Sequence, residues 1–451
     1  MNGPTARQPA PVPAPTAQQA GEIRSRWDWV EAEVWTDPML TALEQGVKGG
    51  KWFRLVDKVY ALRNLRKAFG RVKANHGSAG VDRQTIEMFE RDLEANLEKL
   101  SQALKDGTFR PNAIKREWIP KPGSNDKRPL GIPTVRDRVV QTALRSVLEP
   151  IFERNFHEHS YGFRPKRSCK DALRRVDELL SQGYRWIVDV DLKSYFDTIP
   201  HDKLMERVRE KVADGKVLML IESFLKQGVL DGLKNWTPDA GTPQGAVISP
   251  LLSNIYLDPL DQQMARDGHE MVRYADDFVI QCRSEQEARE ALKRVQEWTA
   301  QAGLMVHPEK TRIVYCPKDE DGGPEGNFDF LGYRFRRKYK MPRPKSWMKI
   351  RDTIRDKTPR RNGQSLDTII KDVNRTLCGW FEYYKHSAEK TFAILDGFIR
   401  RRLRSILMRR KKKAGHGWGS AHKIWSNAYF VRQGLMSLVQ AHRLAVQSSR
   451  R

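Results

Sequence analysis

Residues 271–280 read MVRYADDFVI, and the interpretation of the whole chain starts from this stretch. Apolar residues alternate up to Tyr274 and resume at Phe278, which predicts two short β-strands joined by a tight turn. Asp276 and Asp277 would lie at the tip of that hairpin. Adjacent carboxylates repel each other, so they need either a basic side chain or a divalent metal ion beside them. The motif YADD alone is more often a solvated turn, and the rest of the chain must decide.

The composition indicates a polyanionic partner. The 451 residues carry a formal net charge of +25, which is typical of proteins that bind nucleic acid. The length indicates two or three domains. No uncharged apolar run approaches the roughly 18 residues of a membrane span, so no membrane partner is expected. The four cysteines lack C-x-x-C spacing, which argues against a zinc ribbon or a disulfide framework and favours a reducing cytosol.

Changes in composition divide the chain into five segments. Residues 1–22 are rich in Pro and Ala and are expected to form a disordered leader. Helices are expected in 23–112, one of them from about Ile86 to Asp106. A mixture of strands and helices is expected in 113–335, including a helix from Val135 to Glu149 that Pro150 would end. A helical domain is expected in 336–405, followed by a basic nucleic-acid-binding region in 406–451. The predicted fold class is therefore α/β (α+β).

A second acidic stretch precedes the hairpin. Residues 186–193 read WIVDVDLK, a buried strand in which Asp189 and Asp191 would share one face. Burying an acid is unfavourable unless a metal or a hydrogen bond compensates its charge. Asp191, where the strand ends, is therefore a candidate metal ligand, with Asp189 the less certain neighbour.

Two loops have the composition of ligand-binding loops. Lys121, Lys127 and Arg128 are expected in a basic loop between two strands, where they would suit a triphosphate or a nucleic-acid backbone. A solvated basic loop is the alternative. Residues 240–245 read AGTPQG, a Gly/Pro loop that leads into an apolar helix.

The joint order of the motifs resembles that of reverse transcriptases, and closely that of the reverse transcriptase/maturase proteins encoded by bacterial group II introns. The resemblance covers about residues 50–400. It implies a right-hand polymerase, with fingers and palm in 113–335 and an α-helical thumb/maturase domain in 336–405. The motifs are IPK (119–121), RPLGIPT (128–134), YGFRP (161–165), DLKSYF (191–196), TPQG (242–245), YADD (274–277) and GWFEYY (379–384).

The resemblance implies a catalytic centre with two divalent metal ions. Asp191 and Asp276 would be the principal ligands, and Asp277 the supporting one. All-oxygen ligation together with substrate phosphates suits Mg²⁺, with Mn²⁺ as a possible substitute.

The resemblance also implies a dNTP site. Lys121 and Arg128 would neutralise the incoming triphosphate, and Gln244 would seat the nucleotide. Lys310 matches the position proposed to donate a proton to pyrophosphate. Phe196 would face the sugar C2′ and exclude a 2′-hydroxyl, which favours DNA synthesis over RNA synthesis, although core packing alone would also account for an aromatic residue there.

Basic and aromatic residues are the candidates for nucleic-acid contact. Runs of charge are usually solvated faces, but here aromatic residues interleave with cations, which suits base stacking and phosphate contact. The candidates are Arg63, Arg66, Lys67, Arg164, Trp380, Tyr383, Tyr384, Arg400, Arg401, Arg404, Arg409, Arg410, Lys411 and Lys412.

The expected function is an RNA-directed DNA polymerase that also binds intron RNA to assist splicing and supports retromobility. Its partners would be the intron RNA or another RNA template, a DNA or RNA primer, a DNA target and dNTPs, in the bacterial cytosol or, when bound to DNA, at the nucleoid. The absence of a Cys/His cluster after about residue 420 indicates an endonuclease-lacking member. Two alternatives stay open: a related enzyme recruited to defence or DNA repair, and a non-catalytic RNA-binding splicing factor.

Overall fold

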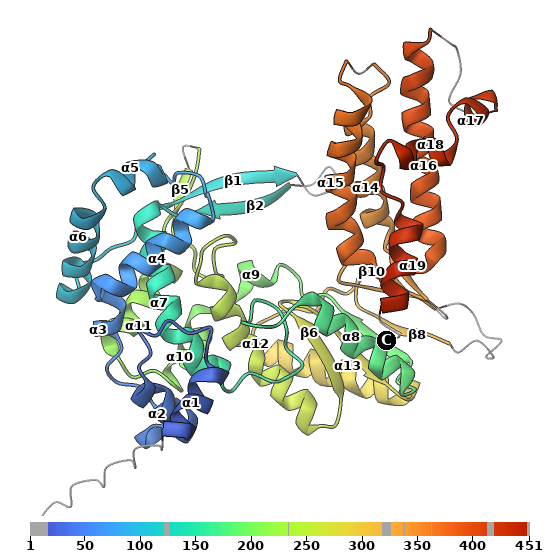
Figure 1. Ribbon diagram of the computed structural model, residues 1–451. Coiled ribbons are helices and arrows are strands. Elements are labelled where there is room, and N and C mark those ends of the chain that lie inside the picture. The colour runs from blue at the N-terminus through green and yellow to red at the C-terminus, as the bar shows by residue number, and fades with distance from the viewer. Residues whose placement is uncertain are drawn as a thin grey trace, which may run out of the picture.

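The computed structural model describes the chain in seven stretches, which together contain an α+β fold as predicted. Figure 1 shows N-terminal helices in blue, two sheets with their helices in cyan to yellow, and a bundle of helices in orange to red. Among the described residues no helix is long and apolar enough to cross a bilayer, and the four cysteines are free. The described residues are 17–120, 127–232, 234–317, 326–336, 339–361, 363–412 and 419–448.

The N-terminal helices differ from the prediction at two points. Helix α1 begins at Ala17, so the expectation of disorder is wrong for residues 17–22, while residues 1–16 lie outside the described ones. The single helix expected from Ile86 to Asp106 breaks at Asp92, whose φ of −115° and ψ of 38° are not helical. The helices are α1 (Ala17–Arg26), α2 (Asp37–Gln45), α3 (Val56–Tyr60), α4 (Leu62–Ala74), α5 (Ile86–Arg91) and α6 (Leu93–Asp106), with a 3₁₀ turn at Lys48–Gly50.

A small sheet and a buried helix follow. The sheet has the order β2-β1-β4-β5, and helix α7 (Val135–Glu153) packs against α4. Pro150 was expected to end this helix but lies inside it. Proline cannot donate to the carbonyl four residues earlier, and here the indole Nε1 of Trp35 donates to the Ser146 carbonyl instead, at 3.1 Å. The strands are β1 (Ile114–Pro120), β2 (Lys127–Ile132), β4 (Val229–Asp231) and β5 (Lys234–Trp236).

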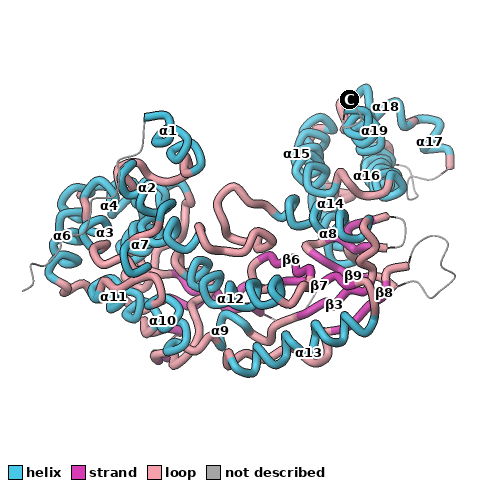
Figure 2. The backbone as a smooth tube through the Cα atoms, turned by 90° about the horizontal axis from the view of Figure 1, so that it is seen from below, coloured by secondary structure: helices cyan, strands magenta, loops and turns pink. Residues whose placement is uncertain are grey.

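The central sheet is antiparallel and carries the predicted hairpin. Its strand order is β6-β7-β3-β8. Val188 and Phe278 belong to the core that α12 and α13 share, whereas Ile187 and Val279 pack with α8 and the aromatic residues of β9 and β10. Figure 2 shows α13 running along the sheet. The strands are β3 (Trp186–Val190), β6 (Glu270–Tyr274), β7 (Asp277–Cys282) and β8 (Arg312–Tyr315), and the helices are α8 (Cys169–Ser181), α9 (Tyr195–Thr198), α10 (His201–Arg209), α11 (Gly215–Leu225), α12 (Ser249–Arg266) and α13 (Glu285–Gln301).

The C-terminal domain is helical, with a core of its own. Its third helix, α16, runs to Arg410, past the boundary expected at residue 405. A three-stranded sheet of order β11-β10-β9 precedes these helices. The elements are β9 (Phe328–Phe330), β10 (Tyr333–Phe335), β11 (Lys340–Pro342), α14 (Pro344–Lys357), α15 (Leu366–Tyr384), α16 (Glu389–Arg410), α17 (Ser420–Ile424), α18 (Asn427–Arg432) and α19 (Leu438–Ser448).

Candidate active site

The YADD motif forms a two-residue hairpin turn. Strands β6 and β7 pair up to Tyr274 opposite Asp277, which leaves Ala275 and Asp276 as the turn. Asp277 is thus the first residue of β7 rather than part of the tip. Ala275 has a φ of 61°, an uncommon conformation for a residue other than glycine.

Strand pairing brings Asp191 to this turn. Strand β3 is antiparallel to β7, with Val190 opposite Phe278, so continuing the same register by one residue sets Asp191 opposite Asp277. Because side chains alternate along a strand, Asp189 lies on the same face as Asp191. The three acids that the resemblance selects therefore meet at one end of the two central strands, β3 and β7.

The close approach of the carboxylates shifts their pKa values. Burial raises the pKa of Asp277 to about 7, and repulsion from Asp189 and Asp276 adds to the increase. Burial also raises the pKa of Asp276. A backbone hydrogen bond acts to lower this pKa, and repulsion from Asp191 acts to raise it further. Each carboxylate makes ionisation of its neighbour less favourable, so the site favours a bound cation.

The donor set fits a hard divalent ion. Asp191, Asp276 and Asp277 offer carboxylate oxygens only, the ligands that Mg²⁺ prefers, and these residues would hold the metal. Basic residues already touch the edge of the group: Lys310 Nζ lies 3.3 Å from Asp191 Oδ1, and Arg312 Nε lies 3.2 Å from Asp189 Oδ2. Lys310 therefore lies beside the carboxylate of Asp191, and its role as a proton donor to pyrophosphate stays a prediction.

A buried arginine clamps the YADD turn through hydrogen bonds. Arg273 is fully buried, and its Nε donates to Asp261 Oδ1 at 2.7 Å. Its Nη1 donates to Asn254 Oδ1 and to the Ala275 carbonyl, both at 2.9 Å. Asn254 in turn donates to the Gly162 carbonyl at 2.8 Å. The guanidinium of Arg273 thus connects α12 with the hairpin turn, and through Asn254 with the loop before α8 that contains Gly162.

The loop before α8 straps the turn. Tyr161 N donates to the Arg273 carbonyl at 2.8 Å, and Gly162 lies directly over the turn. A Cβ added to Gly162 would be 2.2 Å from Ala275 N, so only glycine allows this approach. The sequence analysis did not select Arg273, Asp261 or Asn254 as site residues. The feature that could have identified them is a polar or charged residue inside an otherwise apolar strand or helix.

Two of the predicted nucleotide-binding residues, Phe196 and Gln244, line one cavity. A cavity of about 290 Å³ is lined by Pro129, Phe196, Trp236 and Gln244, among others. Thr242 N donates to the Phe196 carbonyl and Gly131 N to the Gln244 carbonyl, both at 2.6 Å. The TPQG loop is thereby held between α9 and β2.

Two further cations were predicted to contact the triphosphate. Arg128 is exposed on β2, and its charge acts to lower the pKa of Asp276, so it lies close enough to the carboxylates to influence them. Lys121 lies outside the described residues.

Some of the predicted nucleic-acid contacts are exposed. Arg63, Arg66 and Lys67 project from α4, where Arg66 pairs with Glu94 and Lys67 lies 3.6 Å from Glu33. The run Arg409–Lys412 is exposed at the end of α16. Since surface ion pairs are weak, these cations are available to phosphates.

Other predicted contacts have structural roles. Arg164 is 7% exposed, and its Nε donates to Glu153 at 2.9 Å. Arg404 is 2% exposed, and its Nε donates to the Trp425 carbonyl at 2.8 Å. Because both guanidinium groups are committed to protein acceptors, we assign these two arginines to the scaffold rather than to a nucleic-acid surface.

The aromatic residues of the GWFEYY motif join two domains. Tyr383 Oη donates to the Leu331 carbonyl, and Tyr333 Oη donates to the Tyr383 carbonyl, both at 2.6 Å. Tyr384 is 8% exposed and packs on Tyr333, and Trp380 stacks on Tyr384 at 5.0 Å between ring centroids. These rings pack at the junction of the two domains, and their role as stacking platforms for bases stays a prediction.

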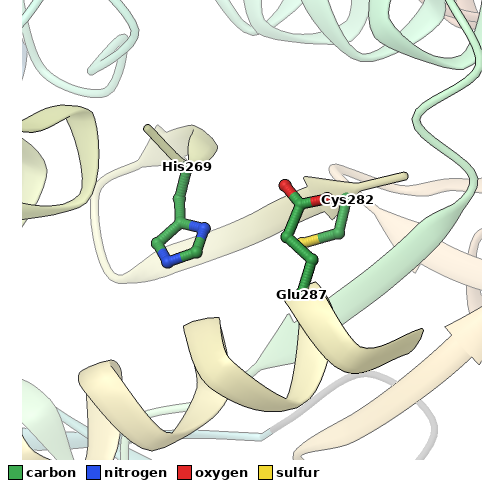
Figure 3. A group of neighbouring side chains, drawn as sticks. All are labelled: His269, Cys282 and Glu287. Atoms are coloured by element: carbon green, nitrogen blue, oxygen red, sulfur yellow. The ribbon is translucent and has the colours of Figure 1, made fainter. Parts of the chain in front are cut away.

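A different group of potential metal ligands lies at the other end of β7. His269, Cys282 and Glu287 have ligand atoms within 4.8 Å of one another (Figure 3). Glu287 Oε2 accepts from Arg283 N at 2.9 Å, and Glu287 N donates to Ser284 Oγ at 3.2 Å, so Ser284 caps the N-terminus of α13 and Glu287 binds the N–H that precedes the cap. Burial, with Glu287 nearby, raises the pKa of the Cys282 thiol to about 12. We assign this group to helix capping and core packing.

Two family profiles match the chain. Residues 119–335 match reverse transcriptase (RNA-dependent DNA polymerase), and residues 347–425 match the group II intron maturase-specific domain. The two matches meet near the junction between the sheet domain and the helical domain.

Individual relatives agree with these matches. The group II intron-encoded protein LtrA of Lactococcus lactis subsp. cremoris is 41% identical over 197 residues, which are 43% of this chain and 32% of LtrA. Protein YkfC of Escherichia coli (strain K12) is 34% identical over 334 residues, 65% of this chain and 84% of YkfC. Nuclear intron maturase 4, mitochondrial, of Arabidopsis thaliana is 28% identical over 219 residues, 48% of this chain and 26% of that protein. The chain thus spans 32% of the length of LtrA but most of YkfC.

Replacing Arg273 by Met should destabilise the fold strongly. The change leaves Asp261 as a buried, uncompensated charge, which costs about 3–5 kcal/mol. Urea denaturation followed by circular dichroism measures the loss. As a control, Arg289→Met removes an exposed ion pair with Glu285 and should cost less than about 1 kcal/mol. Equal effects of the two variants would contradict the clamp.

The metal-free protein should lose stability as the pH rises through the titration of Asp277. The folded pKa, about 7, lies above the ordinary value of 3.8, so this contribution is fully present below the ordinary value and is lost toward pH 7. We expect the free energy of unfolding in EDTA to decline more between these pH values for wild type than for Asp277→Asn. A difference between the two proteins that does not change with pH would refute the assignment.

Proposed function

The chain belongs to the group II intron reverse transcriptase/maturase family, and from this premise we propose that it is an RNA-directed DNA polymerase that copies RNA into DNA. One observation carries the proposal: antiparallel pairing of β3 with β7 gathers Asp191, Asp276 and Asp277 at one end of these two central strands. Substrate phosphates meeting these carboxylates would require divalent cations between them.

Each group near the carboxylates has a task in nucleotidyl transfer. Two Mg²⁺ ions, replaceable by Mn²⁺, would stabilise charge on the attacking 3′-oxygen and on the leaving pyrophosphate. Arg128 neutralises the triphosphate of the dNTP. Gln244 and its loop seat the nucleotide, and the Phe196 ring excludes a 2′-hydroxyl. Lys310, beside Asp191, supplies a proton to pyrophosphate.

The second proposed activity is that of a maturase. Exposed cations of α4 and of the end of α16 would contact the phosphates of intron RNA, and the grip would weaken with salt because binding releases counterions. The protein would act in the bacterial cytosol on an RNA template, a DNA or RNA primer and a DNA target. Recruitment of such an enzyme to defence or DNA repair would employ the same active site, and a non-catalytic splicing factor would need only the RNA grip.

Asp276→Ala should abolish primer extension while RNA binding persists. Asp276 is a proposed metal ligand, and removing a half-buried acid that repels its neighbours should not harm folding. Extension of a primer on an RNA template with dNTPs and Mg²⁺ measures activity, and filter binding measures RNA affinity. Asp276→Asn should behave in the same way, because the amide lacks the charge. Normal extension by either variant would overturn the ligand assignment.

Phe196→Ala should relax the discrimination against ribonucleotides. The ring lines the cavity beside the TPQG loop, and its removal would leave room for a 2′-hydroxyl. The ratio of kcat/KM for dNTP over rNTP in single-nucleotide addition measures the effect. Trp236→Ala enlarges the same cavity from β5 and serves as the matched control. Unchanged selectivity of Phe196→Ala would mean that the ring only packs.

A further inference from the structure

The helical domain contains a cavity of its own. Its volume is about 400 Å³, and its walls come from α14, α16 and the segment that begins with α17. Trp347 and Arg351 contribute from α14, Gly397 and Arg401 from α16, and His422 from α17. This volume falls in the range of small-ligand sites.

The charged lining of this cavity is entirely basic. Among its described lining residues there are several arginines and one histidine, but no Asp or Glu. The guanidinium groups of Arg351 and Arg401 lie 4.8 and 5.6 Å from the Phe398 ring centroid. The Nε of Arg351 is buried and has no hydrogen-bond partner among the described residues. The cavity therefore has positive charge and an N–H group ready for an anion.

The protein compensates this charge only in part. Arg400 lies 3.6 Å from Asp396, but that carboxylate is 3% exposed and also accepts from Leu438 N at 3.1 Å. Burial, followed by repulsion from Arg400, lowers the pKa of Arg404. Crowded guanidinium groups of this kind suit a bound phosphate.

A glycine forms part of the cavity wall. Gly397 is inside α16, where glycine weakens a helix relative to alanine. A Cβ at this position would have no protein atom within 4 Å, so packing does not require glycine. Gly379 in α15 is equally unhindered, but it does not line the cavity. At Gly397 a methyl group would occupy space in the cavity itself.

The cavity and the proposed catalytic carboxylates share no residue, because the described lining of the cavity comes only from the helical domain. In Figures 1 and 2, α15 is nearer to the N-terminal helices, and α16 and α17 are farther from them. The run Arg409–Lys412 on the same helix α16 is exposed and extends the positive surface beyond the cavity. A polynucleotide that follows this surface need not be the primer–template at Asp276.

We propose that this cavity binds one unpaired nucleotide of RNA, with its base beside Trp347 and Gly397 and its phosphate at Arg351 and Arg401. The volume suits a single nucleotide rather than a duplex, and unstacked RNA bases are commonly held by aromatic and guanidinium planes. The assignment rests on the proposed maturase function and specifies where that function grips RNA.

The test compares Gly397→Ala with the matched control Gly379→Ala. Both changes favour the helix, so thermal stability should be unchanged or higher in both. The affinity for a single-stranded RNA oligonucleotide, measured by fluorescence anisotropy, should fall about tenfold for Gly397→Ala alone, because the base loses its place in the cavity. RNA containing 4-thiouridine should crosslink to the peptide that carries Trp347 in wild type, and much less in Gly397→Ala.

Each outcome of this test is decisive. Wild-type affinity and crosslinking in Gly397→Ala would overturn the nucleotide site, as would an equal loss of affinity in Gly379→Ala. An equal effect on single-stranded DNA of the same sequence would overturn the assignment to RNA. Primer extension on an unrelated RNA template should remain unchanged in Gly397→Ala. Failure of wild type to extend a primer would instead contradict the proposed polymerase function.

Discussion

Repulsion between carboxylates is the constraint on which the centre of this molecule depends. Asp276 and Asp277 are held beside Asp191 although burial and mutual repulsion raise the pKa values of the first two. The fold withstands this cost through a buried cation on the opposite side of the turn, because Arg273 binds Asp261 and the Ala275 carbonyl. Arg273 holds the turn, and the face that carries Asp191 and Asp277 is left with a surplus of negative charge.

The same clamp links the active site to its surroundings. Asn254 accepts a hydrogen bond from Arg273 and donates one to the Gly162 carbonyl. Gly162 lies so close to Ala275 that a side chain would not fit. Two of the predicted dNTP residues, Phe196 and Gln244, are held through their backbone carbonyls, which accept from Thr242 N and Gly131 N. The site is therefore built from rigid elements, which suits a reaction that depends on the positioning of phosphates.

The helical domain separates two tasks. Its tyrosines at 383 and 384 pack on β10 and join it to the central sheet, so these aromatic residues fix the orientation of the domain. Its arginines instead gather around a cavity on α14 and α16. A sequence pattern that mixes aromatic and basic residues thus divides, in three dimensions, into a junction and a basic surface.

The sequence by itself predicted the hairpin, the fold class and the family, because alternation, motif order and residue type can be read directly from the chain. It also selected the three acids that the structure brings together. The tertiary structure decided the rest. The register of β3 against β7 sets Asp191 opposite Asp277, and Trp35 caps the carbonyl that Pro150 leaves free inside α7. It also decided that Arg164 and Arg404 are buried. Burial and pairing depend on residues far away in the chain, and a charged side chain looks the same in sequence whether it faces RNA or a buried carbonyl.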